Sequence, residues 1–412
     1  MNDLIDSSRR AGLHRVAPPA ENDVVDGLTP RAVVRATSTP EVAQALAWSA
    51  QHDLALVARG QGTKLDFGGP PRRVDLIVDV SGLREIIEHA PADFVVRAEA
   101  GVTLASLQET LRPLGQRLPI DDVVPGSTVG GLVATALSGP RRLLDGTVRD
   151  HLLGVTVVRA DGVVARSGSK VVKNVAGYDL AKLLTGSLGT LGIITEAIFR
   201  LRPLPARQVF VSSDLDVETA LAPVLAALAH SQAVPSAIEI AYRPPQRRGT
   251  LAILVEGRDD ALSARVDAIR ALLPGAAAIS PEPPPAWGRL PGPLVIKLAV
   301  QLSLVAQLPG ELARLAAATG ISAEWRGSAG SGVTYLGLDG DVTAGQLRSV
   351  LNFLRERVAP GGGSAIVLRA PTKLKADVDL FGPVPGLSLM ERVKARFDPA
   401  HRLAPGRFVG GW

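Results

Sequence analysis

Residues 186–195 read GSLGTLGIIT, three glycines at a spacing of three that run into a β-branched strand. Glycine has no Cβ atom, so the backbone of such a loop can lie directly alongside a ligand. The flanking sequence predicts a short helix over residues 180–184 and a strand within LGIITEAIFRLRP, residues 191–203. This glycine loop between a helix and a strand is the first candidate binding element of the chain.

Two further glycine loops come earlier in the chain. Residues 58–64, ARGQGTK, follow the predicted strand LALV, and two glycines at a spacing of two can turn the backbone so that its N–H groups converge on a phosphate. Residues 125–131, PGSTVGG, lead into a predicted helix whose N-terminus favours an anion. Leu65 stands where the third glycine of the dinucleotide-binding fingerprint belongs, and no P-loop motif occurs. Each loop alone could be an ordinary turn, but three in one half of the chain favour a ligand site.

The order of the predicted elements indicates an α+β protein rather than a regularly alternating barrel. In the first half, Thr39 followed by Pro40 is predicted to cap one helix and Thr103 another. After Pro203 and Pro205 the pattern changes to two βαββαβ-like units, which fit one antiparallel sheet with helices on one side. The expected divisions are an N-terminal segment 1–28, a first domain 29–205, a second domain 206–388 with a Pro-rich insert 281–292, and a C-terminal segment 389–412.

The composition excludes several classes of function. The 412 residues include no cysteine, so the chain has no disulfide and no Cys-ligated zinc or iron–sulfur site. Its six histidines form no pair at metal-ligand spacing, so we predict no metal site. The net charge of +5 comes from scattered basic pairs without interleaved aromatics, which argues against nucleic-acid binding. The sequence shows neither a secretory signal nor an apolar run long enough for a membrane span, so we expect a cytoplasmic protein without direct membrane insertion.

The motifs RGQGTK, PGSTVGG and GYDLAKLLTGSLGTLGIITEAIFRLRP, in this order and spacing, resemble the PCMH-type FAD-binding domain of the vanillyl-alcohol oxidase family. The segments KVVKNVAGYDLAKL and FDPAHRLAPGR are similar, more narrowly, to the FAD-binding subunit of bacterial glycolate oxidase. This resemblance implies a two-subdomain FAD-binding domain followed by a ferredoxin-like α+β cap domain with an antiparallel sheet.

The resemblance also implies which residues would hold FAD. Residues 59–64 would hold the pyrophosphate, residues 125–131 its other side and the ribityl chain, and the backbone of Ile194 the adenine half. The implied cofactor-binding residues are Arg59, Gly60, Gln61, Gly62, Thr63, Lys64, Pro125, Gly126, Ser127, Thr128, Gly130, Gly131, Thr135, Ser138, Gly139, Gly189, Thr190, Gly192, Ile193 and Ile194. Some relatives carry a covalently flavinylated His in the first loop. Because Gln61 and Thr63 occupy that stretch here, we expect non-covalent FAD.

Oxidation of a 2-hydroxy acid by a flavin needs a base for the hydroxyl and a cation for the carboxylate. The candidate catalytic residues share the segment SKVVKNVAGYD, and they are Lys170, Lys173, Asn174 and Tyr178. A cation beside the flavin would stabilise its reduced anionic form, although solvated loop lysines explain this segment equally well. Arg369 and Lys373 are the candidates for binding the substrate carboxylate, with an ordinary surface position as the more common explanation.

The resemblance implies an FAD-binding oxidoreductase subunit of a glycolate oxidase-like complex that oxidises glycolate to glyoxylate. Electrons would pass through the flavin to an FAD-linked partner subunit and an iron–sulfur subunit, and any membrane association would come through these partners. Related 2-hydroxy-acid enzymes often carry paired histidines in the second half, which this chain lacks. Two alternatives therefore stay open: a self-contained FAD-dependent 2-hydroxy-acid dehydrogenase and a non-catalytic assembly subunit stabilised by FAD. A UDP-sugar enolpyruvyl reductase shares the FAD fold, but its substrate-domain motifs are not evident.

Overall fold

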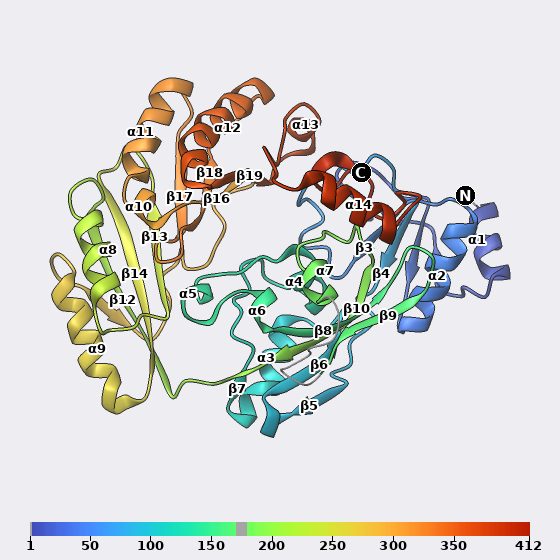
Figure 1. Ribbon diagram of the computed structural model, residues 1–412, viewed down its shortest axis with the longest axis horizontal. Helices are drawn as coiled ribbons and strands as arrows, with labels where there is room; N and C mark the ends of the chain where they lie inside the picture. The colour runs from blue at the N-terminus through green and yellow to red at the C-terminus, as the bar shows by residue number, and fades with distance from the viewer. Residues whose placement is uncertain (1, 170–178) are drawn as a thin grey trace. The chain divides into compact units, whose positions relative to one another are not determined.

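The computed structural model describes residues 2–169 and 179–412 (Figure 1). The chain forms two compact units, each described by itself below. Unit 1 comprises Met1–Leu137, Thr147–Pro203 and Pro383–Trp412, and unit 2 comprises Ser138–Gly146 and Leu204–Gly382. The C-terminal segment therefore belongs to the first unit, and one short segment of the first half belongs to the second.

The first sheet of unit 1 has the strand order β1-β2-β4-β3, in which β2, β4 and β3 run parallel. Its elements are α1 (Asn2–Arg10), β1 (Val16–Ala17), β2 (Ala32–Arg35), α2 (Thr39–Gln51), β3 (Leu56–Arg59) and β4 (Leu76–Asp79). The prediction that Thr39 caps α2 is wrong, because the hydroxyl of Ser38 accepts the Glu41 N–H and Thr39 is already helical. Ser and Thr are both favoured at an N-cap, Ser somewhat more, so the adjacent pair offered two acceptable caps one residue apart.

The second sheet of unit 1 is antiparallel, with the order β5-β6-β10-β8-β9. Its strands are β5 (Glu88–Ala90), β6 (Val95–Glu99), β8 (Leu152–Val158), β9 (Val164–Gly168) and β10 (Ile193–Arg200). The remaining elements here are α3 (Leu104–Leu111), α4 (Val129–Thr135), α6 (Val148–His151), α7 (Leu180–Leu184) and the ribbon of β7 (Gln116–Arg117) with β11 (Arg202–Pro203). The Thr103 cap and the helix over 180–184 confirm two sequence predictions. Gly162 (φ +85°) lies in the turn of the β8–β9 hairpin.

Unit 2 is built on one eight-stranded antiparallel sheet in the order β15-β12-β14-β13-β17-β18-β16-β19. Its strands are β12 (Arg207–Asp216), β13 (Ala237–Tyr242), β14 (Arg248–Gly257), β15 (Ala278–Ser280), β16 (Val295–Ala299), β17 (Ala323–Ser328), β18 (Val333–Leu338) and β19 (Ser364–Arg369). Its helices are α5 (Arg142–Asp145), α8 (Leu221–His230), α9 (Asp259–Leu272), α10 (Leu302–Val305), α11 (Leu308–Thr319), α12 (Ala344–Val358) and α13 (Thr372–Lys375). This architecture confirms the predicted α+β class with an antiparallel second sheet.

The two faces of the unit 2 sheet differ in chemistry because strand side chains alternate between faces. Helices α8, α9, α11 and α12 cover one face (Figure 1), and strand residues such as Ile240, Leu298 and Trp325 form the core beneath them. The other face carries polar residues at its centre. At one end of that face, Trp287 of the Pro-rich insert packs edge-on against Phe210, with ring centroids 4.9 Å apart.

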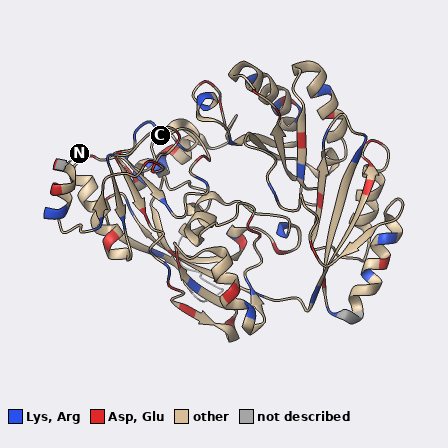
Figure 2. Cartoon of the chain, turned by 180° about the vertical axis from the view of Figure 1, so that it is seen from behind, with Lys and Arg blue, Asp and Glu red and all other residues tan. Residues whose placement is uncertain are grey.

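Lys and Arg residues are spread over both units rather than gathered on one element (Figure 2). Several form surface ion pairs, such as Arg247 with Asp216 at 3.0 Å and Arg314 with Glu311 at 2.7 Å. Within residues 2–169 and 179–412, no helix combines the length and apolar character that crossing a bilayer requires. The same residues contain no group of three or more His, Asp or Glu side chains arranged to hold a metal ion.

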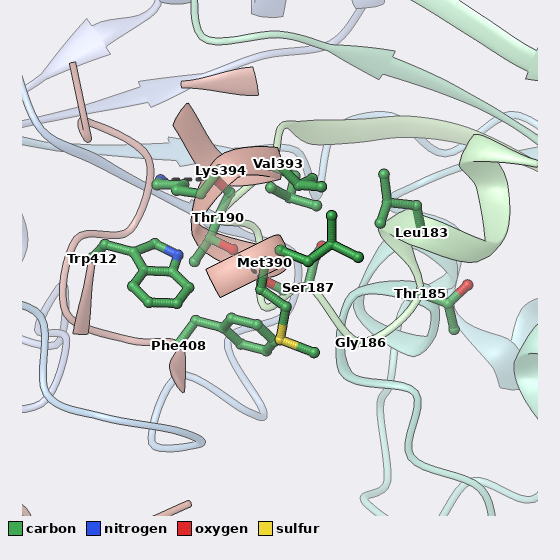
Figure 3. Close-up of a pocket in the computed structure, with 12 residues that line it drawn as sticks. Leu183, Thr185, Gly186, Ser187, Thr190, Met390, Val393, Lys394, Phe408 and Trp412 are labelled. Atoms are coloured by element: carbon green, nitrogen blue, oxygen red, sulfur yellow. Dashed lines mark hydrogen bonds between the residues drawn. The ribbon is translucent and has the colours of Figure 1, made fainter. Parts of the chain in front are cut away.

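A buried ammonium group ties the C-terminal segment to the rest of unit 1. Helix α14 (Leu387–Phe397) carries Lys394, whose side chain is buried. Its Nζ donates to Asp398 Oδ2 at 2.7 Å, to the Thr190 carbonyl at 2.9 Å and to the Leu403 carbonyl at 3.1 Å; Figure 3 shows Lys394 beside Thr190. Asp398 also accepts the Leu403 N–H at 2.7 Å. This network joins α14, the third glycine loop and the C-terminal tail.

Replacing Lys394 with Met removes the ammonium group and leaves the Asp398 carboxylate buried without its cation. We expect K394M to lower the free energy of unfolding by about 3–5 kcal/mol, measured by chemical denaturation. The double variant K394M/D398N removes both charges and should recover much of this loss. An equal loss in both variants would show that the ion pair is not the source of the stability.

Candidate functional site

The three glycine loops predicted from the sequence meet at one cavity of unit 1. Its volume is about 90 Å³, room for a phosphate group or a few water molecules. The wall consists of Val57, Ala58, Arg59, Gly60, Gly62, Thr63, Lys64 and Leu65 around the first loop, Gly131, Ala134 and Thr135 of α4, Leu188 and Gly189 of the third loop, and Arg407 of the tail. Segments far apart in the sequence therefore converge on one small site.

Glycine is needed where the first loop meets helix α4. A Cβ atom on Gly60 would overlap the side chain of Thr128, the N-cap of α4. Gly62 has a φ of +76°, in the left-handed region that favours glycine. At the start of the helix, a Cβ on Gly130 would lie 2.9 Å from the Ala100 Cβ. The missing side chains let the loop and the helix N-terminus approach each other.

Arg59 is held by two carboxylates at the base of the first loop. Its Nη1 donates to Asp23 and its Nη2 donates to Asp79 Oδ2 at 2.7 Å. Burial raises the pKa of Asp23, but the hydrogen bonds from Arg59 and the Ala20 N–H outweigh it and hold that pKa below its ordinary value. Arg59 lines the cavity, as its implied role at the pyrophosphate requires, and that contact with the cofactor stays a prediction. Its two ion pairs brace the first loop.

Lys64 and Arg407 bring positive charge to the cavity wall. Lys64 Nζ donates to Ser127 Oγ at 2.5 Å, which links the first and second glycine loops. Arg407 Nη2 donates to the Phe67 carbonyl at 2.6 Å. Its Nη1 is buried without a hydrogen-bond partner in the described part of the chain, and the nearest carboxylate oxygen, of Asp26, is 3.8 Å away. Since an unsatisfied buried donor is unfavourable, a phosphate oxygen would complete this group.

The sequence analysis assigned no role to Arg407. The residue lies 340 positions from Phe67, which its side chain contacts. A β-bridge between Leu56 and Leu403 brings the tail beside β3, whose end begins the first glycine loop. The tail motif FDPAHRLAPGR was the available signal for this residue. Arg407 follows Pro405-Gly406, a pair typical of a turn, so the motif indicates a turn that carries a cation.

Several predicted cofactor residues lie outside the cavity wall. They are Gln61, Pro125, Gly126, Ser127, Thr128, Gly130, Ser138, Gly139, Thr190, Gly192, Ile193 and Ile194. Ser138 and Gly139 belong to unit 2. A Cβ on Gly192 would meet the side chain of Val157 in β8, so this glycine serves packing. Ile194 of β10 pairs with Val157 of β8, and the pairing of β10 with β6 begins only at Glu196. The predicted contact of Ile194 with adenine stays a prediction.

The predicted catalytic residues Lys170, Lys173, Asn174 and Tyr178 lie outside the described residues. Of the predicted substrate residues, Arg369 ends strand β19 in unit 2 and is partly buried. Lys373 lies on α13 and is exposed. The roles of all these residues stay predictions.

Unit 1 has a second, apolar cavity of about 320 Å³ beside the C-terminal helix (Figure 3). Its wall consists of Leu183, Thr185, Gly186, Ser187, Thr190, Leu191, Leu389, Met390, Val393, Lys394, Phe408 and Trp412. Thr190, predicted to bind FAD, faces this cavity, and Lys394 is ion-paired with Asp398. The third glycine loop therefore separates a charged cavity from an apolar one.

Residues 30–168 match the protein family described as FAD binding domain. This part of the chain is an FAD-binding domain. The matched range contains the first two glycine loops, residues 59–64 and 125–131, and the cofactor is FAD. The residues present fit this cofactor, because the glycine loops, Lys64 and the unsatisfied Nη1 of Arg407 suit a pyrophosphate.

Curated relatives with similar sequences include glycolate oxidase subunits and D-lactate dehydrogenases. "Glycolate oxidase subunit GlcE" of Escherichia coli (strain K12) is 36% identical over 171 residues, covering 41% of this chain and 48% of that protein. "Glycolate oxidase subunit GlcD" of Bacillus subtilis (strain 168) is 32% identical over 216 residues, covering 52% and 46%. "D-lactate dehydrogenase" of Archaeoglobus fulgidus is 35% identical over 188 residues, covering 46% and 41%. The matches thus span about half the length of these relatives.

Among solved structures, an alkyldihydroxyacetonephosphate synthase superimposes on the chain with a TM-score of 0.71. The superposition covers 99% of this chain and 86% of the synthase, at 15% sequence identity. At this identity the likeness shows a shared fold, which extends beyond the FAD-binding domain into unit 2.

Arg407 provides a test of the FAD site. R407M removes the unsatisfied donor and its charge. We expect FAD to bind about ten- to a hundredfold more weakly, because a hydrogen bond to a charged group contributes about 1.5–3 kcal/mol. The measurement is a fluorescence titration of the apoprotein with FAD. R72M changes an exposed arginine near the tail and should leave the affinity as in the unaltered chain. Equal affinity in R407M and R72M would contradict the assignment.

Proposed function

We propose that this chain is the FAD-binding subunit of an oxidoreductase complex that oxidises a small 2-hydroxy acid, with glycolate as the first candidate substrate. The observation that carries the proposal is the phosphate-sized cavity built by three glycine loops and Arg407 in an FAD-binding domain. Similarity to two subunits named for glycolate oxidase supports the choice of substrate class.

Bound FAD supplies the hydride acceptor for oxidation of an alcohol carbon. The residues of this chain would hold it in place: the glycine N–H groups, Lys64 and Arg407 at the pyrophosphate, and the flat side of α4 formed by Ala134 and Thr135. Arg59 also contributes indirectly, because its ion pairs with Asp23 and Asp79 brace the first loop. This binding relies on backbone and small side chains rather than aromatic stacking.

Electrons taken from the substrate need a route out of the flavin. The chain has no cysteine and so cannot ligate an iron–sulfur cluster through thiolates. We therefore assign the onward transfer to an FAD-linked partner subunit and an iron–sulfur subunit, as in a glycolate oxidase-like complex. The complex would work in the cytoplasm, with any contact to the membrane made by the partners.

A self-contained D-lactate dehydrogenase is the second candidate. The similarity to the enzyme named D-lactate dehydrogenase in Archaeoglobus fulgidus favours it. The two candidates differ in whether the isolated chain turns over, and D-lactate and glycolate differ by one methyl group next to the reacting carbon.

Anaerobic mixing of substrate with the FAD-loaded chain tests the proposed reaction. We expect glycolate, or D-lactate for the second candidate, to bleach the visible flavin absorbance, because hydride transfer destroys the oxidised chromophore. The isolated chain and the chain with its co-purifying partners are compared. If neither acid bleaches the flavin in either preparation while dithionite does, a 2-hydroxy-acid oxidoreductase is excluded and a structural role for FAD remains.

The linkage of the cofactor has its own test. The first loop carries Gln61 and Thr63 where some relatives carry a flavinylated His, so FAD should be held non-covalently. Acid precipitation of the yellow protein is expected to release all flavin into the supernatant, measured by its fluorescence. Flavin that stays with the precipitated chain would contradict this prediction.

A further inference from the structure

A pair of side chains stands on the face of the unit 2 sheet opposite helices α8, α9, α11 and α12. Lys297 on β16 lies directly opposite Tyr335 on β18 in the antiparallel register, so both side chains leave the sheet on the same face. Their neighbours Leu298 and Leu336 belong to the core under the helices, which places Lys297 and Tyr335 on the other face. Tyr335 is only 6% exposed. A cation and a hydroxyl thus share a covered position.

Lys297 has no partner of opposite charge. Within residues 2–169 and 179–412, its ammonium group makes no ion pair and no hydrogen bond. Burial lowers the pKa of Lys297 to about 8, and the nearby charge of Arg142 adds to this effect. Burying an unpaired charge is unfavourable, so a lysine is a poor choice here for stability alone.

Arg142 brings a second cation to the same place. It begins helix α5, a segment of unit 2, and its guanidinium group also makes no ion pair or hydrogen bond within the described ranges. Its neighbour Arg141 behaves differently, because its Nε donates to Glu256 Oε1 at 3.1 Å and its Nη2 to Gln208 Oε1 at 3.1 Å. Arg142 lies close enough to lower the pKa of Lys297, and neither cation has an ion pair with a carboxylate in the described ranges; Glu324 on the same face is paired with Arg326. Two like charges in this arrangement favour an anion.

Tyr335 completes the group with a hydroxyl. Its oxygen is buried and has no hydrogen-bond partner in the part of the chain that the structure describes. Burial raises the pKa of this hydroxyl; the charge of Arg142 opposes the effect and that of Glu239 on β13 reinforces it. The hydroxyl is therefore a proton donor at neutral pH. Ser328, on the same face, has a second buried hydroxyl oxygen without a partner.

The geometry points to Arg142, Lys297 and Tyr335 as the site that binds the carboxylate of a small organic acid. Two cations and a hydroxyl donor match the two oxygens of one carboxylate, and a bound carboxylate would satisfy the groups that now lack partners. The choice of a 2-hydroxy acid as the natural ligand rests on the proposed function, whereas the anion site rests on unit 2 alone. This site replaces Arg369 and Lys373 as our assignment for the substrate carboxylate.

Binding of oxalate tests the site without turnover, because oxalate has no C–H bond to oxidise. The FAD-loaded chain is titrated with oxalate by calorimetry at pH 7, beside K297M, R142M and Y335F. We expect K297M and R142M to weaken binding at least tenfold and Y335F several-fold. R270M, which removes an exposed arginine of α9 on the helix-covered side, serves as the matched control and should bind as the unaltered chain does.

The outcomes separate this inference from the proposed function. Oxalate binding that depends on Lys297 supports the site even if no 2-hydroxy acid reduces the flavin. Unchanged oxalate affinity in K297M and R142M, no oxalate binding by the unaltered chain, or tighter binding of inorganic phosphate than of oxalate overturns the site. The site is also overturned if R369M or K373M loses oxalate binding while K297M keeps it. This outcome holds whether or not glycolate bleaches the flavin.

The thermal unfolding midpoint of K297M separates a ligand-binding lysine from a structural one. Replacing a structural lysine would lower the midpoint, whereas replacing a ligand-binding lysine should raise it. K297M removes an unpaired, partly buried charge, so without oxalate it should raise the unfolding midpoint at pH 7. The lysine pKa is about 8 in the folded chain and about 10.4 unfolded, so the charge destabilises the fold below pH 8 and this penalty fades as the pH approaches 10.4. The gain from K297M should fade likewise; a lower midpoint in K297M at pH 7 would indicate a structural role.

Discussion

One buried ammonium group determines where the end of this chain lies. Lys394 binds Asp398, the Thr190 carbonyl and the Leu403 carbonyl at once. With Leu403 held in this way, the tail runs beside Leu56 of β3, the strand that ends in the first glycine loop. The tail then delivers Arg407 to the cavity wall. The FAD site thus depends on an ion pair that lies outside every glycine motif.

The buried and partly buried cations of this protein fall into two groups, those bound to a carboxylate and those without one. Arg59, Arg141 and Lys394 are bound to carboxylates and hold a loop, a segment and a helix in place. Arg142 and Lys297 are partly buried and have no such carboxylate within the described ranges, and desolvation makes the charge of Lys297 unfavourable. A protein keeps a destabilising arrangement of this kind where function requires it. The carboxylate-bound Arg59, Arg141 and Lys394 therefore support the architecture, and Arg142 and Lys297 indicate where an anionic ligand belongs.

Local sequence signals predicted the fold well, and long-range contacts explain what they missed. Helix periodicity and cap residues located α3 and α7, and the order of elements after Pro205 predicted the one-sided helix cover of the second sheet. The adjacent Ser38 and Thr39 could not be separated as caps, since both hydroxyls suit the position. No sequence signal singled out Lys297, because its neighbours on β18 and α5 are distant in the sequence. Arg407 could not be placed because a pairing between distant residues brings it to the site.

The most direct measurement is a crystal structure of the chain grown with FAD and oxalate. We expect the pyrophosphate to lie against residues 59–64 with a phosphate oxygen hydrogen-bonded to Arg407 Nη1, and one oxalate carboxylate within hydrogen-bond distance of Lys297 Nζ and Tyr335. Oxalate bound beside Arg369 or Lys373 with no anion at Lys297, or FAD bound away from the first glycine loop, would contradict the account of both sites.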